Sequence, residues 1–167
     1  MYIMNASFHQ FRSKIIHPIQ FRFFLLVKLP TAFLCGLRIR QFSEKSTTIA
    51  VRHWWFTQNP FRSMYFAVQS MAAEMSTGLM CFGQIYKRDP AVSMLVVRVD
   101  SQYIKKATGL ILFTCEDGEK IEAAIEETIR TGEGTGVVTR SVGTNEKNEV
   151  VAEFQITWSF KAKKSIS

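Results

Sequence analysis

Residues 59–79 read NPFRSMYFAVQSMAAEMSTGL, and this stretch decides the fold of the chain. Asn is favoured as a helix cap because its side-chain oxygen accepts a hydrogen bond from a free amide of the first turn, and Pro suits the first helical position. The residues that follow are good helix formers, and Glu74 is their only acid. The stretch therefore predicts a long helix that starts at Asn59-Pro60.

At helical spacing this segment has two different faces. The face of mostly large apolar residues comprises Val68, Ala72, Met75, Leu79, Phe82 and Tyr86. The opposite face of mostly small residues comprises Ser63, Ala67, Ser70, Glu74, Thr77, Gly78 and Cys81. We expect a sheet to wrap the large face, and we expect the small face to let a second backbone approach closely.

The composition fits one globular domain with a basic N-terminal third. The chain has 167 residues, is 47% hydrophobic and 13% aromatic, and carries a net charge of +7. Residues 1–62 contain nine Lys or Arg side chains against Glu44 alone. Such a surface suits a membrane, an acidic cofactor or nucleic acid, and a simply solvated surface is the alternative. No segment matches a nucleic-acid-binding motif, so we expect no nucleic-acid partner.

The cysteines and histidines show no metal-binding or disulfide pattern. Cys35, Cys81 and Cys115 are far apart and odd in number, so we expect no metal site and a reducing, cytoplasmic location. Residues 63–86 are long enough to span a bilayer, but the small stripe and the neighbouring strand patterns favour a helix buried inside a domain. We therefore expect no transmembrane segment.

The remaining segments predict a helical arm, six strands and a second helix. Residues 5–28 form one or two amphipathic helices, broken near His17-Pro18. This arm either packs on the sheet or makes peripheral contact with a membrane or an acyl chain. A helix over residues 117–130 has Asp117 as a plausible cap. Period-two alternation predicts strands over residues 37–42, 47–56, 93–104, 110–115, 135–142 and 150–160.

This order of elements predicts a single α+β domain over residues 1–167. Six mostly antiparallel strands and one very apolar helix indicate a curved sheet wrapped around that helix. We divide the domain into a helical arm over residues 1–29, a core over residues 30–160 and a basic tail over residues 161–167.

The chain resembles the hotdog-fold superfamily of thioesterases and dehydratases. The resemblance is carried by WFTQNPFRS at residues 55–63 and MAAEMSTG at residues 71–78, and it extends from Lys28 to Phe160. It is most similar to a thioesterase-like branch that carries a domain-of-unknown-function label. The resemblance implies the hotdog fold and a homodimer, with a tetramer as the alternative assembly.

The phenylacetate-type thioesterases of this superfamily have an Asn before the central helix, a His-Gly-Gly that begins it, and an acid fifteen residues beyond the Asn. Asn59 and Glu74 match in type and spacing, whereas Tyr65, Phe66 and Ala67 replace the His-Gly-Gly. The resemblance implies that the backbone N–H of Phe66, beside Tyr65, polarises the thioester carbonyl. Glu74 is then the general base or nucleophile, and Asn59 orients the water or the carbonyl.

Helix geometry implies that Asn59 and Glu74 cannot meet on one substrate within one protomer. Glu74 is fourteen residues beyond Pro60, which is roughly 21 Å along a helix. If both residues act together, Glu74 must come from a second copy that runs antiparallel. Ser70 and Thr77 lie one turn to either side of Glu74 and are expected as its partners. The residues expected to contact substrate are Ser63, Ala67, Ser70 and Thr77.

The function that we expect is hydrolysis of an acyl-coenzyme A or acyl-carrier-protein thioester, with no cofactor beyond the carrier in the substrate. The alternative is a non-catalytic hotdog module that binds an acyl chain or serves assembly only. In that case Asn59 is only a cap, Tyr65 is an ordinary aromatic, and Glu74 is a buried carboxylate paired with Arg62 or Arg98. The basic candidates for the nucleotide end of coenzyme A, or for a solvated face, are Lys87, Arg88, Lys105 and Lys106.

Overall fold

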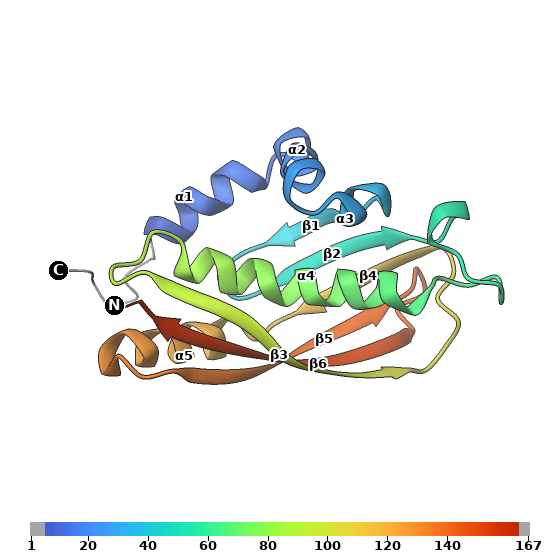
Figure 1. Ribbon diagram of the computed structural model, residues 1–167. Helices are drawn as coiled ribbons and strands as arrows, with labels where there is room; N and C mark the ends of the chain where they lie inside the picture. The colour runs from blue at the N-terminus through green and yellow to red at the C-terminus, as the bar shows by residue number, and fades with distance from the viewer. Residues whose placement is uncertain (1–5, 164–167) are drawn as a thin grey trace.

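The computed structural model describes residues 6–163. One long helix, α4, packs across one face of a twisted antiparallel sheet, and three shorter helices form an arm above it (Figure 1). The helices are α1 (Ala6–Ile15), α2 (Pro18–Lys28), α3 (Pro30–Leu34), α4 (Phe66–Ile85) and α5 (Gly118–Thr131), with a 3-10 turn η1 (Trp55–Thr57).

The sheet has six strands in the order β1-β2-β4-β5-β6-β3, and every neighbouring pair is antiparallel. The strands are β1 (Arg38–Phe42), β2 (Thr47–Arg52), β3 (Val92–Tyr103), β4 (Leu110–Cys115), β5 (Thr135–Thr144) and β6 (Val150–Ala162). The expected α+β architecture, with six antiparallel strands around one apolar helix and an N-terminal helical arm, is confirmed.

The start of α4 differs from the prediction. The helix begins at Phe66 rather than at Pro60, and Tyr65 occupies its cap position with extended backbone angles. The intervening loop cannot be helical because Arg62 has a left-handed backbone angle (φ 58°) and because the amide of Met64 donates to the carbonyl of Ala107 at 2.8 Å. The Asn-Pro pair therefore begins a turn and not the helix.

The sheet covers a different part of α4 from the one that we predicted. Trp158 Nε1 donates to Thr77 Oγ1 at 2.9 Å, and Ser76 Oγ lies 2.8 Å from Ser141 Oγ. Thr77 of the small-residue face and its neighbour Ser76 therefore face the protein's own strands. At the far end of the large face, the ring of Phe82 packs 4.8 Å from Phe11 of α1, so the arm and not the sheet covers it.

The helical arm is broken where the sequence predicted, between α1 and α2 at His17-Pro18. It packs closely on α4 because Gly83 lacks a side chain: a Cβ at this position would lie 2.6 Å from the ring of Phe8. The arm extends to Leu34 through α3, a helix that we did not predict. None of the helices within residues 6–163 is long and apolar enough to cross a bilayer.

Three further boundaries or contacts differ from the sequence prediction. The second strand ends at Arg52, because Thr57 Oγ1 donates to its carbonyl and closes the 3-10 turn. Asp117 makes no side-chain cap bond and instead accepts from the amide of Arg140 at 2.6 Å. The last strand continues to Ala162, so the expected tail begins within β6, and residues 164–167 lie outside the described part.

Candidate functional site

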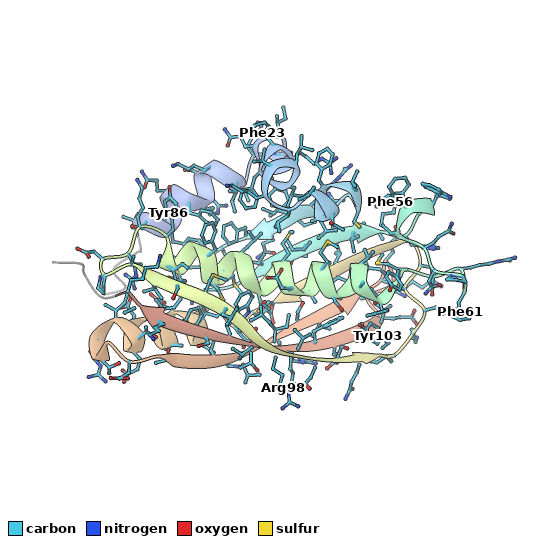
Figure 2. All side chains as sticks on the ribbon, viewed as in Figure 1. Phe23, Phe56, Phe61, Tyr86, Arg98 and Tyr103 are labelled. Carbon is cyan, nitrogen blue, oxygen red and sulfur yellow. The ribbon has the colours of Figure 1, made fainter. Side chains whose placement is uncertain are left out.

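A groove of about 470 Å³ opens beside the first turn of α4. Its walls are the loop before α4, the first turns of that helix, and the end of β3 with the loop that follows. Figure 2 places Phe61 and Tyr103 at this same end of the molecule. The residues that line the groove are Asn59, Pro60, Phe61, Ser63, Met64, Tyr65, Phe66, Gln69, Tyr103, Ile104, Lys105, Lys106 and Ala107.

Asn59 holds the loop that forms one wall of the groove. Its Oδ1 accepts from the amides of Phe61 at 2.9 Å and Ser63 at 3.3 Å, and its Nδ2 donates to Ser63 Oγ at 3.1 Å. The Asn59 amide also donates to the carbonyl of Ser63 at 2.8 Å. Both ends of the Asn59 side chain are thus used to fix the chain just before α4, so its interactions within this protomer are those of a positioning residue.

The first turn of α4 has free backbone amides, and one of them belongs to Phe66, which lines the groove. No described side chain caps this end of the helix, and the first amides of an α-helix have no acceptor within the helix. Tyr65 is not among them, because its amide donates to the carbonyl of Thr57 at 2.8 Å. The amides of Phe66 and Ala67 therefore stand where the helix dipole favours negative charge. The side chains of Tyr65 and Phe66 are half exposed, with ring centroids 4.7 Å apart.

Gln69 is a groove residue that the sequence analysis missed. Its side chain is buried, Nε2 donates to the carbonyl of Met64 at 3.3 Å, and Oε1 is buried without a hydrogen-bond partner among the described residues. An unpaired buried acceptor is costly and calls for a ligand or water. The local sequence does not single out Gln69, because the same helix also contains Gln84.

Glu74 lies two turns beyond the start of α4 at Phe66 and does not line the groove. Its Oε1 packs 3.0 Å from the position that a Cβ on Gly78 would occupy, and the ring of Trp158 lies 3.2 Å from the same position. Burial raises the pKa of the Glu74 carboxyl. No hydrogen bond or ion pair to this carboxylate forms within residues 6–163, so the expected pairing with Arg62 or Arg98 is absent.

The residues expected beside Glu74 have other partners. Ser70 Oγ lies 3.3 Å from the hydroxyl of Tyr103, and Thr77 Oγ1 donates to the backbone carbonyl of Glu74 at 3.0 Å. Neither side chain contacts the Glu74 carboxylate. Of the predicted substrate-contact residues, Ser63 lines the groove, whereas Ala67, Ser70 and Thr77 lie along α4 outside its lining.

The four basic candidates are also divided. Lys105 and Lys106 line the groove, where Lys106 Nζ donates to the carbonyl of Phe61 at 3.3 Å. Lys87 and Arg88 lie beyond the C-terminal end of α4. The twenty residues of that helix span roughly 30 Å, so these two cations are far from the groove.

The cysteines offer no reactive thiolate. All three are buried and free, and burial raises the pKa of Cys115 to about 12 and that of Cys81 well above its ordinary value. A thiol with a raised pKa stays protonated at neutral pH and is a poor nucleophile. Among the described residues, no three His, Cys, Asp or Glu side chains gather as metal ligands.

Comparisons with known proteins identify the fold. A family model described as a domain of unknown function, DUF4442, matches residues 19–160. A Pseudomonas aeruginosa protein of unknown function, described as a probable thioesterase, superposes with a TM-score of 0.74 at 18% identity, over 90% of this chain and 99% of that one. The comparison with curated proteins gives no match.

Three other similar structures come from two proteins that are described as thioesterases. A Haemophilus influenzae thioesterase has a TM-score of 0.60 at 12% identity, over 84% of this chain and 89% of that one. A Staphylococcus aureus thioesterase variant has one glutamine changed to alanine. It superposes with a TM-score of 0.63 at 16% identity, over 79% of this chain and 98% of that one. A second variant of the same protein has one glutamate changed to alanine. It superposes with a TM-score of 0.62 at 16% identity, over 78% of this chain and 97% of that one. The expected hotdog fold is confirmed.

Proposed function

The chain belongs to the DUF4442 family of domains of unknown function and has the hotdog fold, and we propose that it is a homodimeric hydrolase of acyl thioesters. The substrate is an acyl-coenzyme A or an acyl-carrier protein, and no cofactor is needed beyond that carrier. Three free cysteines are consistent with a reducing, cytoplasmic location.

The observation that carries this proposal is the part of α4 that remains open. Ala67, Ser70, Met71 and Glu74 are only half-buried, and they form one stripe along the helix. The stripe is symmetric about the midpoint between Ser70 and Met71. If a second α4 packs antiparallel across this midpoint, Ala67 of one protomer faces Glu74 of its partner.

The open edge of β3 supports a second copy on this side. β3 is an edge strand of twelve residues, and among the strands of residues 6–163 it pairs with β6 alone. Its side chains Leu95, Val97 and Val99 are exposed, by 65%, 55% and 47%. A long apolar edge of this kind is a template for pairing with another chain. Ser70 of the α4 stripe lies beside Tyr103 at the end of this strand, so both features belong to one surface.

In the proposed mechanism, the free amides of Phe66 and Ala67 bind the thioester carbonyl oxygen and stabilise the oxyanion that forms on it. Glu74 of the partner subunit takes a proton from water as the water oxygen attacks the carbonyl carbon. The C–S bond then breaks, and the same proton passes to the thiolate that leaves. The products are a carboxylic acid and a free thiol.

The other groove residues have supporting roles in this proposal. Asn59 keeps the loop and the first amides of α4 in place, and the unpaired Oε1 of Gln69 accepts a hydrogen bond from the attacking water or from the amide-rich arm of the carrier. Aromatic side chains give the groove an apolar wall, which suits a small organic ligand. Lys106 at its rim supplies charge for phosphates, whereas Lys105 pairs with Glu149 at 2.7 Å.

A spacing in one relative agrees with this assignment. The glutamine and the glutamate that were changed to alanine in the two Staphylococcus aureus variants are fifteen residues apart. Asn59 and Glu74 are also fifteen residues apart. An amide and an acid at this spacing therefore recur between this chain and a protein described as a thioesterase.

The test is thiol release from acyl-coenzyme A substrates of increasing chain length, with the wild type and Glu74→Gln. We expect turnover by the wild type, and a loss of kcat of about 10²–10⁴-fold in Glu74→Gln, as is usual when a general base is removed. Glu133→Gln removes an exposed carboxylate elsewhere and serves as the matched control. Equal activity of Glu74→Gln and wild type would exclude the proposed base.

One observation favours a non-catalytic module as the second candidate. The bulky side chains of Tyr65 and Phe66 stand where the phenylacetate-type enzymes have His and Gly, and both are half exposed beside the groove. They narrow the approach to the helix amides and offer aromatic surface to an acyl chain. Tight binding of acyl chains with no thiol release at any chain length would favour this candidate over the hydrolase.

A further inference from the structure

The outer face of α2 is apolar and open. Ile19, Phe23, Leu26 and Val27 are exposed, Ile19 by 74% and Phe23 by 68%. They recur at helical spacing on one side of α2, and Figure 2 shows Phe23 pointing away from the body of the protein. Scattered exposed apolar residues are ordinary, but a continuous stripe on one helix indicates an interaction surface.

Aromatic side chains extend this surface beyond α2. Trp54, Trp55 and Phe56 are exposed around the 3-10 turn, Trp55 by 76%. Trp54 and Leu34 of α3 line one groove of about 460 Å³, so the aromatic turn lies next to the end of the arm. Trp is enriched at the boundary between lipid and water because its ring is apolar and its N–H needs a polar partner.

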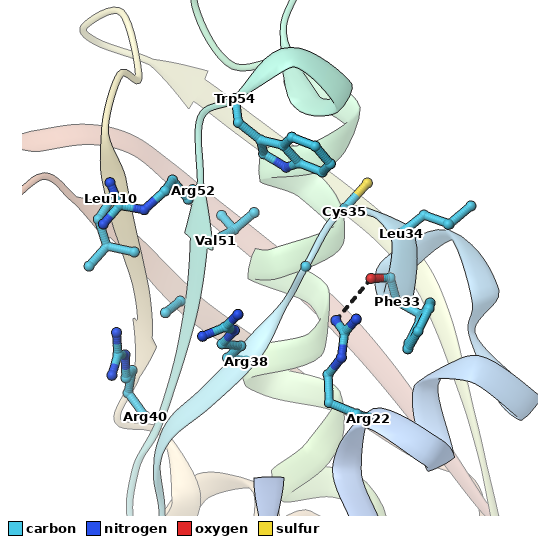
Figure 3. Close-up of a pocket in the computed structure, with 12 residues that line it drawn as sticks. Arg22, Phe33, Leu34, Cys35, Arg38, Arg40, Val51, Arg52, Trp54 and Leu110 are labelled. Carbon is cyan, nitrogen blue, oxygen red and sulfur yellow. Dashed lines mark hydrogen bonds between the residues drawn. The ribbon is translucent and has the colours of Figure 1, made fainter. Parts of the chain in front are cut away.

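Four arginines lie in the same groove. Arg22 comes from α2, Arg38 and Arg40 from β1, and Arg52 from the end of β2 (Figure 3). A second groove of about 420 Å³, with an apolar wall that includes Ile19, shares three of these arginines. The cationic grooves and the apolar stripe of α2 are therefore one continuous surface, which we call the arm face.

The charges of the arm face are not balanced by acids. Residues 6–43 contain no Asp or Glu. Within the described part of the chain, no carboxylate forms an ion pair with any of the four arginines of the groove. Arg22 Nη1 donates to the carbonyl of Phe33 at 3.0 Å, and the guanidinium stacks on the Phe33 ring, which fixes its position. Four clustered guanidinium groups without a counter-ion call for anionic ligands.

We propose that the arm face docks on the surface of an anionic phospholipid bilayer. Ile19, Phe23 and the tryptophans enter the boundary between headgroups and acyl chains, and the arginine groove binds lipid phosphates. Apolar side chains beside unpaired cations are the combination that such a surface recognises. A second copy of the chain is a poor occupant, because a two-fold contact would place the arginines of both copies against one another.

The proposal is tested by flotation of the purified full chain with vesicles. We expect binding to vesicles of roughly three parts phosphatidylcholine to one part phosphatidylglycerol, and weak binding to phosphatidylcholine alone. Each cation near an anionic surface contributes about a factor of five in binding, so Arg38→Gln/Arg40→Gln should weaken binding by about 30-fold. Val27→Gln should weaken it several-fold by removing apolar contact.

Each variant has a matched control elsewhere on the surface. Arg130→Gln/Arg140→Gln removes the same net charge from arginines that pair with Glu127 and Glu153. Val138→Gln makes the same substitution as Val27→Gln at a similar exposure, 52% against 57%. We expect both controls to bind vesicles like the wild type.

Three results would overturn the proposal. The first is no binding to the anionic vesicles, and the second is equal weakening by the arm-face variants and their controls. The third is vesicle binding that is unchanged by Val27→Gln and is abolished by a competing DNA duplex. That result would assign the arm face to nucleic acid. If the wild type does not float and Val27→Gln changes its oligomeric state, a second copy covers the face.

Discussion

The two edges of the sheet are built in opposite ways. At one edge, β1 has five residues, a bulge between Ile39 and Gln41, and arginines on its surface. The arm lies beside this edge, where Arg12 Nε of α1 donates to the carbonyl of Phe42 at 2.7 Å. At the other edge, β3 has twelve residues and an exposed apolar row, and its outer side pairs with no strand of the described chain.

This difference shows how one sheet can keep a contact between two copies at one edge and a contact with an anionic surface at the other. Short length, a bulge and charge are the devices that protect an edge strand from pairing with another chain. The β1 edge has all three, and its cations are free for an anionic surface. The β3 edge has a bulge near Val97 and the exposed pair Arg98–Asp100, but it is twelve residues long and its row Leu95, Val97 and Val99 is apolar. We therefore expect the β3 edge to join two copies and the β1 edge to remain outside that interface.

The largest effect is expected from a charge in the middle of β3. If two β3 strands pair antiparallel about the middle of the strand, Val97 lies near the two-fold axis, and Val97→Lys then places two cations close together. Like charges in such positions cost several kcal/mol, which weakens a dimer by more than about 100-fold. We expect a monomer by analytical ultracentrifugation, with loss of any thioesterase activity.

Two controls sharpen the same comparison. Val138→Lys puts a lysine at a similarly exposed site on β5, an internal strand, and Arg40→Thr removes a protecting charge from the β1 edge. Both variants should keep the assembly state of the wild type. A Val97→Lys protein that assembles like the wild type would show that the β3 edge is not the joining surface.

A smaller effect is expected from Asn59, which holds the loop next to the β3 side. Asn59→Ala leaves the amides of Phe61 and Ser63 without their acceptor and should lower the free energy of unfolding by about 1–2 kcal/mol. Asn59→Asp keeps an oxygen acceptor and should lose less. Urea denaturation of the three proteins measures the difference, and equal stabilities would mean that these bonds do not hold the loop.

The smallest effect concerns the pH dependence of stability. Burial raises the pKa of Glu74 in the folded state, so the folded chain holds this proton more tightly than the unfolded chain. The resulting stability is fully present below the unfolded pKa and is lost as pH rises through the folded pKa. Glu74→Gln keeps a neutral side chain at every pH. Its stability relative to the wild type should therefore increase as pH rises from the unfolded pKa of Glu74 to its folded pKa.

Urea denaturation of both proteins from acidic to neutral pH measures this divergence, with Glu133→Gln as the exposed control. Parallel stability curves for Glu74→Gln and the wild type would show that the carboxylate is not held in an unfavourable environment.

Strong local patterns made most elements predictable. Strand β4 has the predicted bounds, and α5 and β1 lie within one or two residues of theirs, because alternation and an isoleucine stripe identify them without ambiguity. The start of α4 was wrong because Asn-Pro begins turns as well as helices. Only the left-handed angle of Arg62 and the contact of Met64 with Ala107 decide between them, and both depend on the folded chain.

The candidate site was less predictable for the same reason. The fifteen-residue spacing of Asn59 and Glu74 is visible in the sequence, but the order of strands that brings residues 103–107 beside α4 is not. Gln69 has no local signature, since its importance comes from an acceptor left unpaired by its surroundings. Nor does the sequence indicate that Trp158 covers Thr77 and leaves only the first half of the α4 stripe open.

The central claim is that each site combines the loop and helix start of one protomer with Glu74 of its partner. The direct test mixes Glu74→Gln with Asn59→Ala, which we expect to lose activity because the first amides of α4 lose their support, and lets the subunits exchange. In a mixed dimer one site then carries both changes and the other carries neither, so random exchange should restore about one quarter of wild-type activity. Mixed dimers that form but stay as inactive as their parents would contradict the account.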